Sequence, residues 1–283
     1  MKRGSYIMNS TSLSKSILHQ KHQELDFLHH FHGLGYDLID LSAIEQFDWT
    51  KLSEDDLGLM NERHKWQHEG FLFALRSDWT NAIVRYRKKY QLDAEKIAYS
   101  GPVYTLNSEK HQYGLETFTS DIDKQTKILK QMVHYIKEHL SITLSVAVIS
   151  HNTLLKTLLS EKELADELTR KFIKERNRDA LAIKIGEKHP VIELMSHPAA
   201  EQANYVKEHM PHLKRHIEEM NLWESILIEE NVSYVYGDML ALPSQTYYKG
   251  ISIQLYSEDK VEPIASGGQY SSPTNAFGIG LNI

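Results

Sequence analysis

Cysteine is absent from the sequence, which excludes disulfide bonds, thiolate chemistry and cysteine-ligated zinc. No run of residues approaches the roughly 20 apolar positions that a membrane-spanning helix needs. The N-terminal residues, MKRGSYIMNSTSLSKS, include basic side chains but no apolar core, so we expect no signal peptide there. These absences favour a cytoplasmic protein that has no contact with membranes.

Positive charge is also scarce, because 32 Lys and Arg stand against 38 Asp and Glu and give a formal net charge of −6. Binding to nucleic acid depends on clustered cations, so we expect no nucleic-acid partner. After Lys260 the sequence contains no Lys or Arg at all, although its Gly-Gly and Gly-x-Gly turns allow a backbone to approach a ligand closely. This segment therefore has the outline of a nucleotide site without the cations that bind phosphate.

Apolar periodicity predicts the elements of the first half. It indicates a helix over residues 12–32 that ends at Gly33, a strand over 36–44, and a strand from Phe71 that breaks near Asp78 and continues as a helix. Strands over 96–106 and 112–119, joined by a tight hairpin, are expected next. A Ser120–Asp123 capping box then begins a helix, which is followed by a strand over 142–148.

The composition changes near residue 152. Residues 152–227 are charged, helix-rich and poor in strand signals, whereas strand character returns at 232–236 and continues to the end. We therefore expect an α+β protein in which residues 1–151 and 228–283 form one core with an antiparallel sheet. The segment 152–227 is predicted to be a helical insertion into that core.

Five separated segments carry recognisable patterns: LRSDWTNAIVRY at 75–86, GPVYTLNSEKHQYGLETF at 101–118, SQTYYKGISIQLY at 244–256, IASGGQY at 264–270 and AFGIGLNI at 276–283. In this order they resemble the LRPExT segment, motif 2, the RGLDYYxGxxFE segment, IAGGGRYD and motif 3 of histidyl-tRNA synthetases. The resemblance implies a class II aminoacyl-tRNA synthetase fold, with an antiparallel sheet flanked by helices. No anticodon-binding domain is expected, because nothing follows the motif 3 segment.

The departures from these motifs affect the cationic positions. Thr105, Pro243, Gln269 and Ile283 stand where the resemblance implies arginines that hold phosphate, the histidine carboxylate or histidine itself. Each lost donor would cost about 10²–10³ in rate. We therefore expect no adenylation chemistry, no catalytic residues and no cofactor.

Part of an amino-acid pocket remains in the motif positions. The resemblance implies that two residues face the α-amino group of histidine, two project from the motif 2 strand and a tyrosine pair frames the imidazole: Asp78, Thr80, Gln112, Glu116, Tyr247 and Tyr248. Carboxylates and hydroxyls are suitable acceptors for an ammonium group. Each residue also has an ordinary structural role open to it, such as helix capping for Asp78 and Thr80, solvation for Glu116 and strand packing for the tyrosines.

A synthetase-like chain with these losses resembles the regulatory subunits of ATP phosphoribosyltransferase. The resemblance implies a partner, the short-form catalytic subunit, in the first step of histidine biosynthesis. It also implies a dimer through the class II core, a larger hetero-oligomer and feedback control by histidine. Leu41 and Ser42 replace the proline that usually ends motif 1 at the dimer interface. The alternatives are a stand-alone paralogue that activates histidine and a free amino-acid sensor with another partner.

Histidine is abundant, with 16 residues, and His209, His212 and His216 have the spacing of one helix face. Three such ligands would suit zinc. Charged neighbours such as Lys207 and Lys214 favour a solvated helix face instead, so we expect no metal site.

Overall fold

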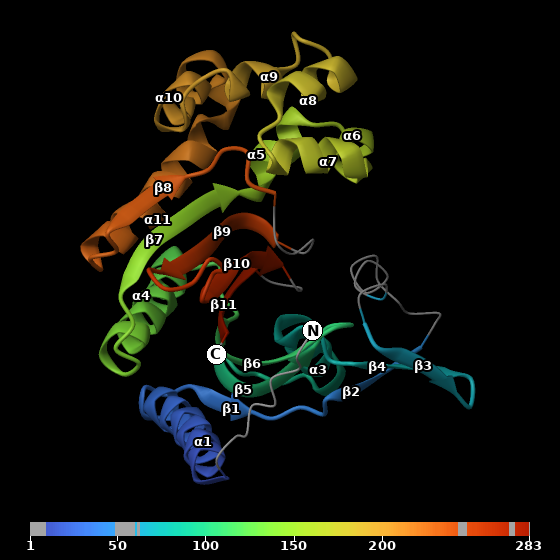
Figure 1. Ribbon diagram of the computed structural model, residues 1–283, viewed down its shortest axis with the longest axis vertical. Coiled ribbons are helices and arrows are strands. Elements are labelled where there is room, and N and C mark those ends of the chain that lie inside the picture. The colour runs from blue at the N-terminus through green and yellow to red at the C-terminus, as the bar shows by residue number, and fades with distance from the viewer. Residues whose placement is uncertain (1–9, 49–59, 61–62, 243–247, 272–274, 283) are drawn as a thin grey trace, which may run out of the picture.

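An eight-stranded sheet forms the centre of the protein, as the computed structural model shows for residues 10–48, 60, 63–242, 248–271 and 275–282 (Figure 1). Its strands, in spatial order, are β1 (Asp37–Ile39), β5 (Lys96–Tyr104), β6 (Glu109–Thr117), β11 (Asn275–Asn282), β10 (Ala265–Ser271), β9 (Tyr248–Ser257), β7 (Leu144–His151) and β8 (Tyr234–Gly237). The α+β class and the sheet flanked by helices are confirmed.

The two edges of this sheet correct the prediction of a purely antiparallel sheet. The inner pairs are antiparallel, but β1 pairs with β5 and β7 pairs with β8 in parallel. Parallel neighbours need a long crossover connection. A smaller sheet and a helix separate β1 from β5, and a series of helices separates β7 from β8.

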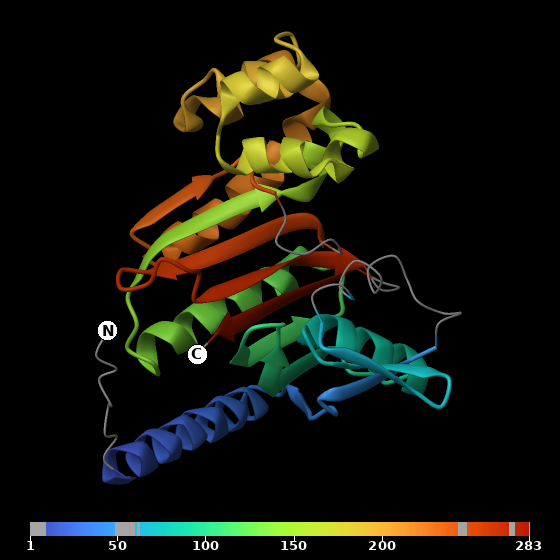
Figure 2. The ribbon, with the colours of Figure 1, turned by 45° about the vertical axis from the view of Figure 1, so that its right-hand side comes forward.

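One face of the sheet packs against three helices, α1 (Ser10–Gly33), α4 (Ile122–Glu138) and α11 (Lys214–Glu229), and Figure 2 shows α4 behind the strands. Alternate residues of β6, Tyr113 and Leu115, are fully buried in this layer with Leu129 of α4 and Ile217 of α11. The period of two in the strand and the apolar side of each helix therefore build the core.

The opposite face carries α3 (Trp79–Tyr90), which packs Trp79 and Ile83 against Ile97 and Tyr99 of β5. Asp78 caps this helix, because its Oδ1 accepts the Asn81 backbone N–H at 2.7 Å. The predicted break near Asp78 and the helix that follows are confirmed.

The strand predicted over residues 36–44 is wrong, because the chain there enters two different sheets. β1 ends at Ile39, and β2 (Ile44–Phe47) joins a three-stranded sheet with β4 (Phe71–Leu75) and β3 (Lys65–His68). The buried Arg76 guanidinium donates a hydrogen bond to the Leu41 carbonyl at 2.7 Å, and the Arg76 backbone N–H donates to the Ala43 carbonyl at 2.7 Å. These two carbonyls therefore bond to Arg76 and not to a neighbouring strand of a continuous ladder.

The residues between β7 and β8 are helical. Ahead of α11 they form α5 (Asn152–Leu158), α6 (Glu161–Ala165), α7 (Glu167–Lys174), α8 (Arg178–Ile185), α9 (Pro190–Met195), α10 (Ala199–His209) and η2 (Pro211–Leu213). Figure 1 shows α6 to α10 gathered at the end of the molecule above β7 and β8. Since α11 returns along β7 and β8, the division into core and insertion stays a prediction.

Two predicted helix ends need correction by one or two residues. Gly35, with φ +80°, rather than Gly33 takes the left-handed conformation after α1. Asp121 rather than Ser120 caps α4, and its Oδ1 accepts the N–H of Asp123 at 3.0 Å and of Lys124 at 3.4 Å. None of the described helices combines the length and apolarity that would span a membrane.

Candidate functional site

The Glu116 carboxyl is the centre of a buried polar cluster on the α3 side of the sheet. The Thr80 hydroxyl donates to Oε1 at 2.6 Å, and the Tyr270 hydroxyl donates to Oε2 at 2.8 Å. The side chain is fully buried, and this burial raises its pKa to about 8 despite the two hydrogen bonds. Both oxygens are thus engaged by neighbours within the chain.

Glycines make room for this cluster in the middle of the sheet. Gly278 of β11 lies opposite Glu116, and a Cβ added there would overlap with the carboxyl group. Gly114 of β6 faces Tyr99 in the same way. Since only glycine leaves this space, the Gly-rich strands serve to admit large polar side chains between neighbouring strands.

Asp78 lies close to Glu116 but is committed to capping α3. Its negative charge contributes to the raised pKa of Glu116, after the larger effect of burial. Thr80, two residues further on, is almost buried and bonds Glu116 directly. Capping by Asp78 and polar contact by Thr80 are therefore both present.

Tyr248 is buried against Tyr270 and Ala276, and Gly268 leaves space for its ring. Tyr247 lies outside the described residues. Gln112 is on the same strand as Glu116 but four residues away, where its Nε2 reaches Asn282 Oδ1 at 3.4 Å. The structure thus brings Thr80, Glu116 and Tyr248 to one cluster through Tyr270.

Tyr270 is the member that sequence reasoning missed. It lies in the IASGGQY segment, beside the Gln269 position that was compared with arginine. A tyrosine that alternates with glycines along a strand was the available signal, because only large side chains need the space that the glycines leave.

Gln269 points away from Glu116. Its Oε1 accepts the Ile251 backbone N–H at 2.9 Å, and its Nε2 donates to Gln125 Oε1 at 2.7 Å. This side chain occupies the space over Gly250, where the β9–β10 register shifts. Gln269 therefore connects β9, β10 and α4.

Thr105 lies in the turn between β5 and β6. Its backbone N–H donates to the Ser108 carbonyl at 2.8 Å, and its side chain is exposed. Pro243 and Ile283, the other two departures, fall outside the described residues.

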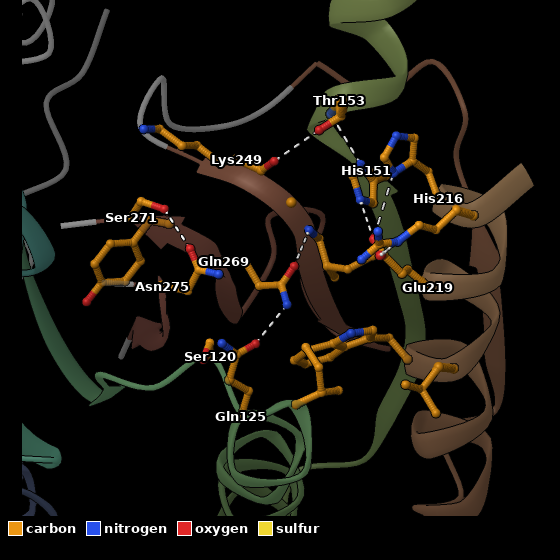
Figure 3. Close-up of a pocket in the computed structure, with 17 residues that line it drawn as sticks. Ser120, Gln125, His151, Thr153, His216, Glu219, Lys249, Gln269, Ser271 and Asn275 are labelled. Atoms are coloured by element: carbon orange, nitrogen blue, oxygen red, sulfur yellow. Dashed lines mark hydrogen bonds and ion pairs between the residues drawn. The ribbon is translucent and has the colours of Figure 1, made fainter. Parts of the chain in front are cut away.

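A cavity of about 490 Å³ lies beside Tyr270, between α4, α5, α11 and the ends of β9 to β11 (Figure 3). Its lining does not include Asp78, Thr80, Gln112, Glu116 or Tyr248. Figure 3 shows His151, His216 and Glu219 together on one wall, with Gln125 and Gln269 on another.

His151 and Glu219 join β7 to α11 at this cavity. His151 Nε2 lies 3.0 Å from Glu219 Oε2, and its Nδ1 accepts the Thr153 N–H at 3.2 Å and so caps α5. A neutral imidazole that accepts at Nδ1 carries its proton at Nε2, so Nε2 donates to Glu219. Burial lowers the pKa of His151, which favours this neutral form.

This geometry does not favour a metal ion bound by His151, His216 and Glu219. The ligand atoms of His151, His216 and Glu219 lie within 4.8 Å of one another. The Nε2 proton of His151, however, leaves no lone pair there for a cation, and its Nδ1 lone pair already serves the helix cap. His209 of the predicted group is elsewhere, because its Nδ1 lies 3.1 Å from the Tyr205 carbonyl.

The fold is that of a class II synthetase-type protein. The core of its sheet is antiparallel and has a glycine-rich polar face, helices cover the reverse face, and a helical segment precedes the last strands. Solved structures share this fold. An ATP phosphoribosyltransferase regulatory subunit/histidyl-tRNA synthetase from Bacillus halodurans has a TM-score of 0.72, with 20% identity over 100% of this chain and 81% of that one. One chain of the ATP phosphoribosyl transferase (HisG:HisZ) complex from Thermotoga maritima has a TM-score of 0.66, with 18% identity over 91% and 95%.

Sequence relatives identify the family to which the chain belongs within this fold class. The histidyl-tRNA synthetase family profile matches residues 13–282. The ATP phosphoribosyltransferase regulatory subunit of Staphylococcus aureus (strain Newman) is 30% identical over 270 residues, which cover 95% of this chain and 99% of that relative. The chain belongs to the histidyl-tRNA synthetase family and, within it, to the ATP phosphoribosyltransferase regulatory subunits.

Proposed function

We propose that this chain is a non-catalytic regulatory subunit that binds the short-form catalytic subunit of ATP phosphoribosyltransferase. It would raise the activity of that subunit in the cytoplasm and contribute to feedback control by histidine. The observation that carries the proposal is the 30% identity to a regulatory subunit over 95% of the chain. The fold shared with a chain of the Thermotoga maritima complex supports it.

The proposal that the chain itself has no synthetase activity is supported by two positions. At Gln269 the side chain is held by Ile251 and Gln125 and points away from Glu116. At Thr105 an exposed side chain in a tight turn bonds Ser108 instead of reaching over the sheet. Neither residue offers a cation, and adenylation depends on positioned cations that neutralise developing phosphate charge.

We infer that Glu116, Thr80 and Tyr248 are the remains of an amino-acid pocket, with Tyr270 as a further member. Asp78, whose charge acts on Glu116, would lie at its border. Thr80 and Tyr270 each already occupy one acceptor site on the two oxygens of Glu116, so histidine would share or compete for this carboxyl. Such a pocket would bind histidine more weakly than an active synthetase does.

A self-dimer through the class II core is the second proposed contact. Figure 2 shows the N-terminal half of α1 extending beyond the sheet. This helix carries large apolar side chains that are about half exposed: Leu13 (47%), Ile17 (52%), Leu18 (58%) and Leu25 (48%). A second copy would bury this surface.

Co-purification tests the proposed partner. A tagged form of this chain, co-expressed with the short-form catalytic subunit of the same organism, should retain that subunit through affinity and size-exclusion steps. Elution of the two proteins as separate species, with and without histidine, would contradict the proposal. Histidine-dependent pyrophosphate exchange by the isolated chain would favour the stand-alone enzyme instead.

A further inference from the structure

The cavity of about 490 Å³ opens on the helix-covered side of the sheet, whereas Glu116 faces α3 on the other side. Tyr270 touches both places, since it lines the cavity and its hydroxyl bonds Glu116. The apolar part of the lining consists of Trp223 and Ile251, both fully buried, with Ile122 and Leu222 more exposed at the border. Most of the other lining residues are polar.

The polar lining contains hydrogen-bond donors that are not used within the described residues. There the Lys249 ammonium makes no ion pair and the Ser120 hydroxyl no hydrogen bond, and both side chains are exposed at the rim. Asn275 uses its Oδ1 to accept the Ser271 hydroxyl at 2.9 Å, which leaves its Nδ2 group available. A cation, a hydroxyl and an amide N–H are suitable donors to a negatively charged ligand. Figure 3 shows Lys249 across the rim from Ser120, so this long, exposed side chain has to turn toward a shared ligand.

The other charges of the cavity are already compensated. Arg215 Nε lies 3.0 Å from Glu219 Oε1, and His151 donates to Oε2 of the same carboxylate at 3.0 Å. The Glu219 charge therefore has two partners, and Lys249 is the one uncompensated cation among the described lining residues. One surplus positive charge matches a singly charged anion.

This balance favours a carboxylate over a phosphate. Phosphate carries nearly two charges and is commonly bound by bidentate arginine or by several cations. Here the lone arginine is turned to Glu219, and a phosphate would meet only Lys249. The buried Trp223 and Ile251 add an apolar surface, which suits the hydrocarbon part of a small organic acid.

His216 provides a further contact for such a ligand. Its Nδ1 is buried without a hydrogen-bond partner among the described residues and lies 3.8 Å from Glu219 Oε2. Its ring packs on His151 with 4.4 Å between centroids. A buried nitrogen without a partner is costly, and a polar group of a ligand in the cavity would satisfy it.

We propose that this cavity binds a small monocarboxylate with a compact apolar part. The Ser120 hydroxyl and the Asn275 amide bind the carboxylate at the rim, the exposed Lys249 side chain turns toward it from β9, and the apolar part lies toward Trp223 and Ile251. The site lies on the opposite side of the sheet from the Glu116 carboxyl, and Tyr270 borders both.

Calorimetric titration of the purified full chain tests this assignment. The probes are phenylacetate, its neutral analogue phenylacetamide, and inorganic phosphate. Phenylacetate should bind with saturation, and the other two should bind at least about tenfold more weakly, because each lacks either the charge or the apolar part. Equal binding of the acid and the amide, tighter binding of phosphate, or no saturable binding of phenylacetate would overturn the proposal.

Variants locate the binding. Lys249→Met should weaken phenylacetate about tenfold or more, and Ser120→Trp should abolish binding by filling the rim. Lys260→Met, which removes an exposed lysine from the β9–β10 loop, is the matched control and should bind as the parent does. Unaltered binding in both rim variants, or an equal loss in the Lys260 variant, would refute the site. Unchanged thermal melting establishes that each variant is folded.

Discussion

Thr80 at the start of α3 and Glu116 on β6 are joined by a 2.6 Å hydrogen bond although they lie 36 residues apart. This bond and the one from Tyr270 hold the buried Glu116 carboxyl. The family resemblance predicted an amino-acid pocket at this place. Thr80, Glu116 and Tyr270 are thus bonded to one another. That relationship makes the following outcomes measurable.

Glu116→Gln should remove a pH dependence of stability. Burial raises the pKa of Glu116 to about 8 in the folded chain, against 4.5 for an ordinary glutamate. Between these values the folded state binds more protons than the unfolded state, so the free energy of unfolding falls as pH rises, by about 3–5 kcal/mol in total. Urea unfolding from pH 5 to pH 9 measures it. A parallel slope in parent and variant would show that Glu116 does not titrate this way.

Gln269→Ala should destabilise the fold. The substitution leaves the Ile251 N–H and Gln125 Oε1 without their partner, which costs about 1–3 kcal/mol. Gln112→Ala is the control, because the Gln112 side chain is only partly buried and makes one long hydrogen bond of 3.4 Å. Its loss should lower the free energy of unfolding by less than about 1 kcal/mol. Chemical denaturation measures both, and equal losses would contradict the bridging role of Gln269.

Gly278→Ala should prevent normal folding or cost several kcal/mol, since the added methyl group would overlap with the Glu116 carboxyl. Gly33→Ala adds the same methyl group in α1, where nothing lies within 4 Å, and should be neutral or stabilising by up to about 1 kcal/mol. Soluble yield and melting temperature distinguish the two. A Gly278→Ala protein as stable as the parent would remove the packing argument for the Gly-rich strands.

Ile17→Glu should weaken self-association, because it places a charge within the exposed apolar surface of α1. His19→Glu introduces a similar charge at an exposed polar position of the same helix and serves as the control. Light scattering coupled to size exclusion reports the mass of each. If the parent is a monomer, or if Ile17→Glu keeps the parental mass, α1 is not the dimer surface.

The sequence was sufficient for features that depend on local pattern. The break at Asp78, the helix after it and the paired strands of the central sheet follow from apolar periodicity and capping chemistry. The motif resemblance placed Thr80, Glu116 and Tyr248 near one another, which periodicity alone could not do.

Contacts between residues far apart in the sequence could not be predicted from it. His151 and Glu219 come from β7 and α11, 68 residues apart, and no spacing rule connects them. The single helix face expected for His209, His212 and His216 is not formed, because these residues belong to α10, η2 and α11, which do not make one continuous helix. The strand predicted over 36–44 is divided because the buried Arg76 donates a hydrogen bond to the Leu41 carbonyl in the middle of this segment.

We propose that this chain acts through a separate catalytic subunit. The rate of phosphoribosyl-ATP formation by the short-form catalytic subunit, measured with and without equimolar addition of this chain, tests it most directly. We predict that the chain raises the rate and that histidine lowers the rate of the mixture. An unchanged rate in the presence of the added chain would contradict the account.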